Sequence, residues 1–227
     1  SRLWENWASV RFLCPSSEAL HVLPRNNDPG PVPSDDRQRL LILWPYEDPG
    51  RALNLLPRGR LITVCEGARE RGDLESESRL LYVVFRSRAA GGVPRNADAL
   101  FEQGVRLLGY HLSPDSQEDT LEVALYWEAS RAIGQSYTVF THVLCDDSGT
   151  PRPVGQHDGL PAAGYYPTNR WRPGDVVEDR HTTSLNRQYD EQTCEVRVGM
   201  YLWPSMERLA LVDRRGRLTE QTFFTLH

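Results

Sequence analysis

The sequence contains no lysine: all 26 of its basic residues are arginine. Arginine suits bidentate and stacked contacts better than lysine does, but a complete absence of lysine indicates codon bias rather than design. The chain also lacks any apolar run of about 18 residues, so no segment is expected to span a bilayer. Its N-terminus has no charged-then-apolar signal peptide. We therefore expect either a cytoplasmic chain or a piece of a longer protein.

Several chemical motifs are missing as well. There is no C-x-x-C pair, which argues against a zinc site of the usual spacing. WPYEDPG follows the first predicted strand where a nucleotide-binding protein would have G-x-G-x-x-G. No G-x-S-x-G elbow presents a nucleophile. A cytoplasmic hydrolase, the remaining enzyme alternative, would need a converging acid, base and nucleophile that we cannot assemble. We expect no catalytic residue, no metal and no cofactor.

The composition is that of a folded protein. With 227 residues, of which 39% are hydrophobic and 25% charged, the chain is long enough for one large or two modest domains. Its formal net charge of −5 argues against nucleic acid as a partner, because nucleic-acid binders usually present a basic face.

The first 90 residues predict a small α/β unit. Residues 1–11 predict an amphipathic helix from four apolar side chains at helical spacing: Leu3, Trp4, Trp7 and Val10. The two tryptophans would pack in a core or between domains, or alternatively dock on a membrane surface. Buried strands are predicted in RLLILWPY, LITVC and LLYVVF, with one or two helical turns over residues 49–56. Strands alternating with a short helix are typical of α/β folds.

The second half predicts a different architecture. Residues 87–96, SRAAGGVPRN, have the composition of a linker between domains at residues 1–90 and 97–227. Beyond them the hydrophobic period becomes two in TLEVALYWE, YTVFTHVLC and EVRVGMYLW. About seven short strands separated by turns predict an antiparallel β-sandwich of Ig-like or jelly-roll kind. The overall fold class is therefore α+β.

Four cysteines fall two and two across the proposed boundary: Cys14 and Cys65, then Cys145 and Cys194. One disulfide per domain would fit this distribution in an oxidising compartment. Alternatively, all four are small buried apolar side chains.

The most distinctive segment is residues 154–181, VGQHDGLPAAGYYPTNRWRPGDVVEDRH, an ordered loop that leads into a strand. Sugar rings stack their C–H faces on aromatic rings and need polar partners for their hydroxyls. A glycan site here would use the aromatic side chains of Tyr165, Tyr166 and Trp171 and the polar side chains of Asp158, Asn169, Arg170 and Arg172. Alternatively, the aromatic residues anchor the loop, and Arg170 or Arg172 pairs with Asp175 or Glu178.

His157 and Asp158 resemble a base with its orienting acid. Adjacent residues on an extended chain point to opposite sides, however, so the two are not expected to serve one catalytic site. The alternatives are a metal site shared with His142 or His181, or hydrogen bonds that fix the loop.

From Leu107 onward, six motifs occur in order: LLGYHL, LEVALYWEA, YTVFTHVL, QHDGLP, YPTNRWRPGDVVEDR and VRVGMYL. This series resembles the C-terminal soluble β-sandwich of bacterial multi-spanning membrane glycosyltransferases of the protein O-mannosyltransferase-like class. The resemblance covers about half of the chain, residues 105–203. WPYEDP and LLYVVF fit the preceding extracytoplasmic part of such proteins less closely.

Members of this family use a polyprenyl-phosphate sugar donor and keep their catalytic acidic residues in loops of a membrane domain. The resemblance therefore implies an extracytoplasmic accessory or recognition domain, which is not an enzyme by itself. A preceding region would tether it to the membrane. The implied partners are a glycan and the membrane portion of the parent protein.

Two further hypotheses remain open. The chain could be a free-standing carbohydrate-binding module, which an exposed aromatic platform would favour. It could also be a purely structural interaction domain, which apolar patches near the N-terminal helix, such as an uncovered Trp4 or Trp7, would favour.

Overall fold

The computed structural model describes residues 37–45, 49–71, 76–146 and 149–226. All of them belong to the second of the two units into which the chain divides, residues 36–227. The helix predicted over residues 1–11 lies outside the described residues, as does Cys14. The described part of the chain is mostly β-strand, and none of its helices is long and apolar enough to cross a membrane.

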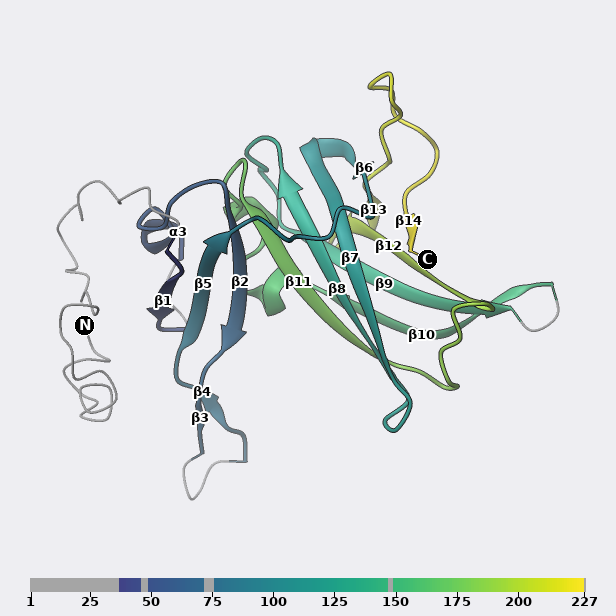
Figure 1. The fold of residues 1–227 in the computed structure, drawn as a ribbon, viewed down its shortest axis with the longest axis horizontal. Coiled ribbons are helices and arrows are strands. Elements are labelled where there is room, and N and C mark those ends of the chain that lie inside the picture. Colours follow the sequence, from purple (N-terminus) through teal and green to yellow (C-terminus); the bar gives the residue numbers. More distant parts are fainter. Residues whose placement is uncertain (1–36, 46–48, 72–75, 147–148, 227) are drawn as a thin grey trace. The chain divides into compact units, whose positions relative to one another are not determined.

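The larger sheet has seven strands, which lie side by side in the order β1-β5-β2-β11-β8-β7-β6 (Figure 1). In that order their bounds are Arg39–Leu43, Val83–Ala89, Arg60–Glu66, Val176–Ser184, Thr120–Ala129, Val105–Asp115 and Ala99–Leu100. Neighbouring strands are antiparallel, except for β2 and β11, which run parallel.

The smaller sheet is antiparallel throughout and has the order β10-β9-β12-β13, with β14 paired to β12. Its bounds are β10 Pro151–Gly159, β9 Tyr137–Asp146, β12 Cys194–Leu202, β13 Glu207–Arg208 and β14 Phe224–Leu226. Alternate residues of its central strands are fully buried, among them Val139 and Val143 of β9 and Val196 and Val198 of β12. One face of this sheet therefore points into a core.

The remaining elements are short. A two-stranded ribbon pairs β3 Arg69–Glu70 with β4 Arg79–Leu80. The helices are α3 Pro49–Leu53 and the 3₁₀ turns η2 Glu102–Gly104, η3 Pro161–Gly164 and η4 Thr168–Arg170. Both η3 and η4 lie between β10 and β11, in the segment that carries most of the predicted ligand-binding residues.

The β-rich second half is confirmed. In β8 the four side chains expected on one face, Leu121, Val123, Leu125 and Trp127, are all 0% exposed. Because a strand with a hydrophobic period of two buries one of its faces, this pattern predicted both the strand and the face that points into the core. The mostly β fold with antiparallel sheets agrees with the predicted β-sandwich.

The predicted α/β unit at the N-terminus is wrong. The helix expected over residues 49–56 is reduced to the five residues of α3. The strands β1, β5 and β2 belong to the larger sheet, because β2 pairs with β11 through the register Val176↔Leu61. A short apolar run is compatible with several sheet types, and only its long-range partner decides between them.

The segment predicted to be a linker crosses the outer face of the larger sheet, over β2, β11, β8 and β7 (Figure 1). Val93 packs there against apolar side chains of four strands: Leu61, Leu108, Tyr126 and Val176. The side chain of Asn96 donates to the carbonyl of Tyr110 at 3.2 Å and accepts from its N–H at 2.9 Å. The strands before and after this segment form one sheet, so it joins parts of one folded unit.

Cys145 and Cys194 form a disulfide between paired positions of β9 and β12. The sequence analysis considered this disulfide for the second proposed domain, residues 97–227. Cys65 is free and exposed.

Candidate functional site

Two of the three predicted aromatic residues lie in the core. Tyr166 is 0% exposed and Trp171 is 4% exposed. The indole Nε1 of Trp171 donates to the carbonyl of Tyr166 at 2.9 Å, and the Tyr166 ring packs edge-on against Phe85 at 5.9 Å between centroids. Burial raises the pKa of Tyr166 to about 12. Both rings therefore anchor the loop to the larger sheet.

Arg172 is also buried, and it binds protein groups throughout. Its Nε donates to Asp175 Oδ2 at 2.7 Å, and its two terminal nitrogens donate to the carbonyl oxygens of Leu53, Leu56 and Pro57. The other carboxylate oxygen of Asp175 accepts from the backbone N–H of Arg60 at 3.2 Å. This cluster ties the loop to the segment between α3 and β2. It matches the predicted alternative in which Arg172 pairs with Asp175.

His157 and Asp158 point to opposite faces of the smaller sheet, as expected of adjacent strand residues. His157 reaches His181 on β11, whereas Asp158 accepts from the Tyr201 hydroxyl at 3.0 Å and lies 3.4 Å from His142 Nε2. Asp158 is therefore on a different surface from the rest of the predicted site. Among the described residues, no group of three His, Cys, Asp or Glu side chains could hold a metal ion.

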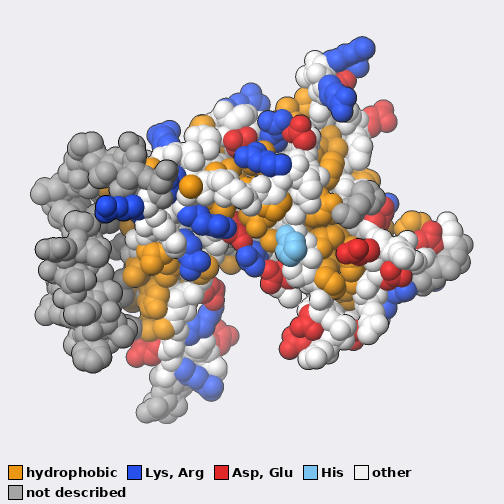
Figure 2. Space-filling view, in the orientation of Figure 1, with side chains coloured by type: hydrophobic (Ala, Val, Ile, Leu, Met, Phe, Trp, Pro, Cys, Tyr) orange, Lys and Arg blue, Asp and Glu red, His pale blue; other side chains and the backbone are white. Residues whose placement is uncertain are grey.

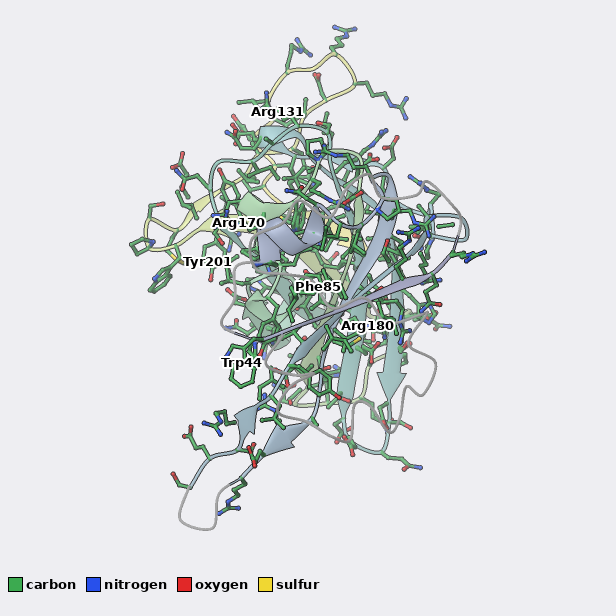
Figure 3. The ribbon with its side chains drawn as sticks, turned by 90° about the vertical axis from the view of Figure 1, so that its left-hand side faces the viewer. Trp44, Phe85, Arg131, Arg170, Arg180 and Tyr201 are labelled. Atoms are coloured by element: carbon green, nitrogen blue, oxygen red, sulfur yellow. A yellow bond between two sulfur atoms is a disulfide. The ribbon has the colours of Figure 1, made fainter. Side chains whose placement is uncertain are left out.

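A groove with a volume of about 350 Å³ brings Tyr165 and Arg170 together with residues that the sequence analysis did not identify. Its other principal lining residues are Leu43, Trp44, Val83 and Phe85, and prolines complete the wall. In Figure 3, Phe85 lies at a height between Arg170 above it and Trp44 below it. Trp44 directly follows β1. The sequence feature that could have marked it as a site residue is a tryptophan at the end of an apolar run, directly before Pro45.

The floor and rim of the groove differ in burial. Leu43, Val83 and Phe85 are buried, Trp44 and Tyr165 are half-buried, and Arg170 is exposed. The lining thus offers an apolar floor, two aromatic side chains with accessible surface and one cation at the edge. Such a combination suits a ligand with apolar faces and polar edges.

Tyr165 is fixed at the rim by the end of β2. Its hydroxyl donates to Glu66 Oε1 at 3.0 Å, and Arg69 donates to Glu66 Oε2 at 2.8 Å. The hydrogen bond from Arg69 is the main cause that lowers the pKa of Glu66, and that from Tyr165 adds to it, while burial acts in the opposite direction. Glu66 therefore remains an ionised acceptor at neutral pH.

The last predicted residue, Asn169, is exposed on η4 beside Arg170 but does not line the groove. The structure therefore divides the predicted set. Tyr165 and Arg170 line one groove, three residues are buried behind the loop, and Asp158 lies on the smaller sheet.

The described lining contains no Asp, Glu, His, Ser or Cys. Among the described lining residues, the charged group is the Arg170 guanidinium, and the rest are apolar or aromatic contact surfaces.

No protein-family model matches this chain, and no curated protein shows significant sequence similarity to it.

Proposed function

We propose that this chain is a non-catalytic recognition domain that binds a glycan in the groove between Trp44 and Tyr165. The observation that carries the proposal is the groove itself, with two half-buried aromatic side chains and Arg170 around a floor that contains Phe85. Sugars bind by stacking C–H faces on aromatic rings, and a guanidinium donates to their hydroxyl oxygens. Because Tyr166 and Trp171 are buried, the stacking partner of Tyr165 is Trp44, which the larger sheet brings to the same groove.

The domain would act as an accessory of an extracytoplasmic membrane glycosyltransferase that uses a polyprenyl-phosphate donor. The ordered strand motifs of residues 105–203 support this assignment. The Cys145–Cys194 disulfide supports an extracytoplasmic location, since structural disulfides persist mainly in oxidising compartments. An Ig-like or jelly-roll topology for the sandwich belongs to the same proposal. A free-standing carbohydrate-binding module would use the groove in the same way.

A glycan array followed by calorimetry tests the groove. We expect saturable binding by the wild type and a loss of about two- to ten-fold in affinity for each of Trp44→Ala and Tyr165→Ala, since aromatic contacts are worth about 0.5–1.5 kcal/mol. Trp203→Ala is the matched control, because Trp203 is 67% exposed and lies outside the groove.

Each variant is first compared with the wild type by circular dichroism and thermal unfolding. Unchanged affinity in the folded double variant Trp44→Ala/Tyr165→Ala would remove the groove from the proposal. An equal loss in Trp203→Ala would place the glycan elsewhere.

A structural interaction domain is the second candidate, favoured by the outer face of β1. Leu40 is 58% and Ile42 is 44% exposed there, and β1 is an end strand of the larger sheet. Figure 2 shows hydrophobic side chains gathered over the region of β1 and β5. Exposed apolar side chains on an end strand are typical of a contact surface.

The pair Leu40→Lys/Ile42→Lys separates the two candidates. If the chain is a recognition domain, these changes leave glycan affinity intact. If it is an interaction domain, they abolish assembly with the parent's membrane portion, measured by co-purification of the two parts.

A further inference from the structure

The outer face of the larger sheet carries an apolar row at its β1 end. Cross-strand partners point to the same side of a sheet, and Ile42 of β1 pairs with Val84 of β5, which in turn pairs with Cys65 of β2. Leu40 lies on the same face, two residues before Ile42. Ile42 is 44% and Leu40 is 58% exposed, Cys65 is exposed and Val84 is half-buried. These four side chains form one accessible surface, the outer patch.

The outer patch and the groove lie on opposite faces of the same strands. Leu43, Val83 and Phe85 line the groove, and in the chain they alternate with Ile42 and Val84 of the outer patch. Successive residues of a strand point to opposite faces of its sheet. A partner that covers the outer patch therefore leaves the groove accessible.

Arginine borders the outer patch on β5. Arg86 is the cross-strand partner of the exposed leucine of β1, and Arg88 follows it on the same face. The Arg86 guanidinium is exposed and makes no ion pair or hydrogen bond with the residues that the structure describes. Arg88 is 48% exposed and lies 3.8 Å from Glu178, which already binds Arg180 and Thr63. Neither β1 nor β5 contains an acidic residue, so the border of the patch is basic (Figure 2).

The dimensions and charge of this surface fit an amphipathic helix with an acidic flank. The row from Ile42 to Cys65 crosses three strands and is about 10 Å wide, close to the diameter of one helix. Leu40 and Ile42 are about 7 Å apart along the strand, close to the rise of about 6 Å between residues i and i+4 of a helix. Acidic residues on one flank of such a helix would reach Arg86. Charge complementarity therefore favours an acidic protein segment.

Two other occupants fit the outer patch less well. A symmetric dimer brings the same patch together from both copies, so Arg86 and Arg88 would meet no carboxylate of β1 or β5. Membrane-surface contacts usually include tryptophan or tyrosine at the interface, and the outer patch contains neither.

We propose that the outer patch is a docking surface for an amphipathic helix of a partner protein, with apolar side chains against Leu40 and Ile42 and an acidic flank against Arg86 and Arg88. This inference goes beyond glycan recognition, since it concerns the opposite face of the sheet. It also names the chemistry of the partner for the interaction-domain candidate. The domain would hold a partner on one face and keep its groove open on the other.

A displayed library of helical peptides tests the outer patch. The peptides have about 15 residues, the length at which isolated helices become marginally stable in water. The library is selected on the full chain and counter-selected on Leu40→Thr/Ile42→Thr, which removes apolar surface while placing residues of good strand propensity in β1. We expect the enriched peptides to carry apolar residues at i and i+4 and a net negative charge.

The affinity of one enriched peptide is then measured by fluorescence anisotropy. We expect Leu40→Thr/Ile42→Thr to weaken binding by about ten-fold or more, because it removes buried apolar area. Arg86→Gln should weaken binding about two- to five-fold, as for one exposed ion pair. The matched controls are Leu218→Thr and Arg215→Gln, since both residues are exposed and lie outside β1 and β5.

Cys65 reports where the peptide lies, because its thiol is free and exposed. Saturating peptide should slow the alkylation of Cys65 by iodoacetamide, followed by mass spectrometry. Unchanged alkylation would place the peptide elsewhere and overturn the proposal. Circular dichroism first establishes that each variant is folded. Should Leu40→Thr/Ile42→Thr fail to fold, Arg86→Gln and the alkylation of Cys65 still decide the proposal.

Three further results would overturn docking of an acidic helix. The first is enrichment of basic or uncharged peptides, or equal binding by a peptide whose acidic residues are replaced by lysine. The second is binding to phosphatidylglycerol vesicles that depends on Leu40 and Ile42, in a chain that selects no acidic peptide. The third is a dimer in analytical ultracentrifugation that Leu40→Thr/Ile42→Thr dissociates, again without acidic peptides.

The glycan measurements stay separate from this test. A chain that selects acidic peptides through the outer patch but binds no glycan supports the docking surface and contradicts the proposed function. A chain that binds a glycan in its groove but selects no peptide through the outer patch overturns the docking surface and leaves the proposed function intact.

Discussion

The Tyr165 hydroxyl donates to Glu66 Oε1 at 3.0 Å, across 99 positions of the sequence. This bond joins the rim of the groove to the end of β2. Glu66→Gln removes the charge of the acceptor while keeping a carbonyl oxygen, so Tyr165 is expected to be held less firmly. We predict a loss of about two- to five-fold in glycan affinity by calorimetry, in line with the modest net worth of one hydrogen bond.

The control for Glu66→Gln is Glu70→Gln, since Glu70 is exposed and pairs with Arg79 away from the groove. Equal losses in both variants would contradict a specific role for the Tyr165 contact.

The same bond has a predictable pH dependence. The pKa of Glu66 is lowered from its ordinary value of 4.5, so the contact is fully present above that value and weakens as the pH falls through the lowered one. Affinity in Glu66→Gln should therefore follow the wild-type pH profile between about pH 7.5 and about pH 5.5, the range in which histidines titrate. A profile that this variant changed in that range would contradict the lowered pKa of Glu66.

Truncation of the two neighbouring tyrosines is expected to reduce the free energy of unfolding by very different amounts. Tyr166→Ala removes a fully buried ring packed against Phe85 and should reduce the free energy of unfolding by about 3–5 kcal/mol. Tyr165→Ala removes a half-buried rim side chain and should cost under about 1 kcal/mol, as is typical outside the core. Urea unfolding measures both, and similar costs would contradict the assignment of one ring to the core and the other to the groove.

Breaking the buried ion pair behind the loop should be severe. Asp175→Ala leaves the Arg172 guanidinium buried without its carboxylate, and we predict a loss of about 3–5 kcal/mol in unfolding free energy. The comparison is Asp98→Ala, which breaks the pair with Arg106; the Arg106 side chain is 44% and the Asp98 side chain 73% exposed. An exposed pair of this kind is worth about 1 kcal/mol or less. Chemical denaturation of the two variants decides whether the buried cluster is structural.

Strands with a strict period of two could be predicted from the sequence because their burial is a local property. In β8, the alternate residues Leu121, Val123, Leu125 and Trp127 are all fully buried, so the seven residues from Leu121 to Trp127 contained the signal. The place of β2 could not be predicted in this way. Its partner β11 is 115 positions away, at Thr63 and Glu178, and an apolar run does not specify a distant register.

The candidate site shows the same division. Tyr165 and Arg170 lie close together in the sequence, in a loop that its aromatic and polar side chains identified as a candidate site. Trp44 reaches the groove only because β1 and β5 join the sheet that carries β11. The left-handed backbone of Ala162 and Ala163, just before Gly164 and Tyr165 of the groove, could not be predicted either, because alanine rarely adopts that conformation.

The disulfide gives the last prediction. Cys145 and Cys194 close a loop of 49 positions, and in the chain-entropy account such a cross-link stabilises the fold by about 4 kcal/mol. The double variant Cys145→Ser/Cys194→Ser, or reduction of the wild type, should lower the free energy of unfolding by about 2–4 kcal/mol, since measured values often fall below the model. Cys65→Ser is the control, because Cys65 is free and exposed and should leave stability unchanged. A double variant as stable as the wild type in urea would mean that the two sheet strands need no cross-link. It would also remove the disulfide as support for an extracytoplasmic location, because a bond that adds no stability gives no reason to place the domain in an oxidising compartment.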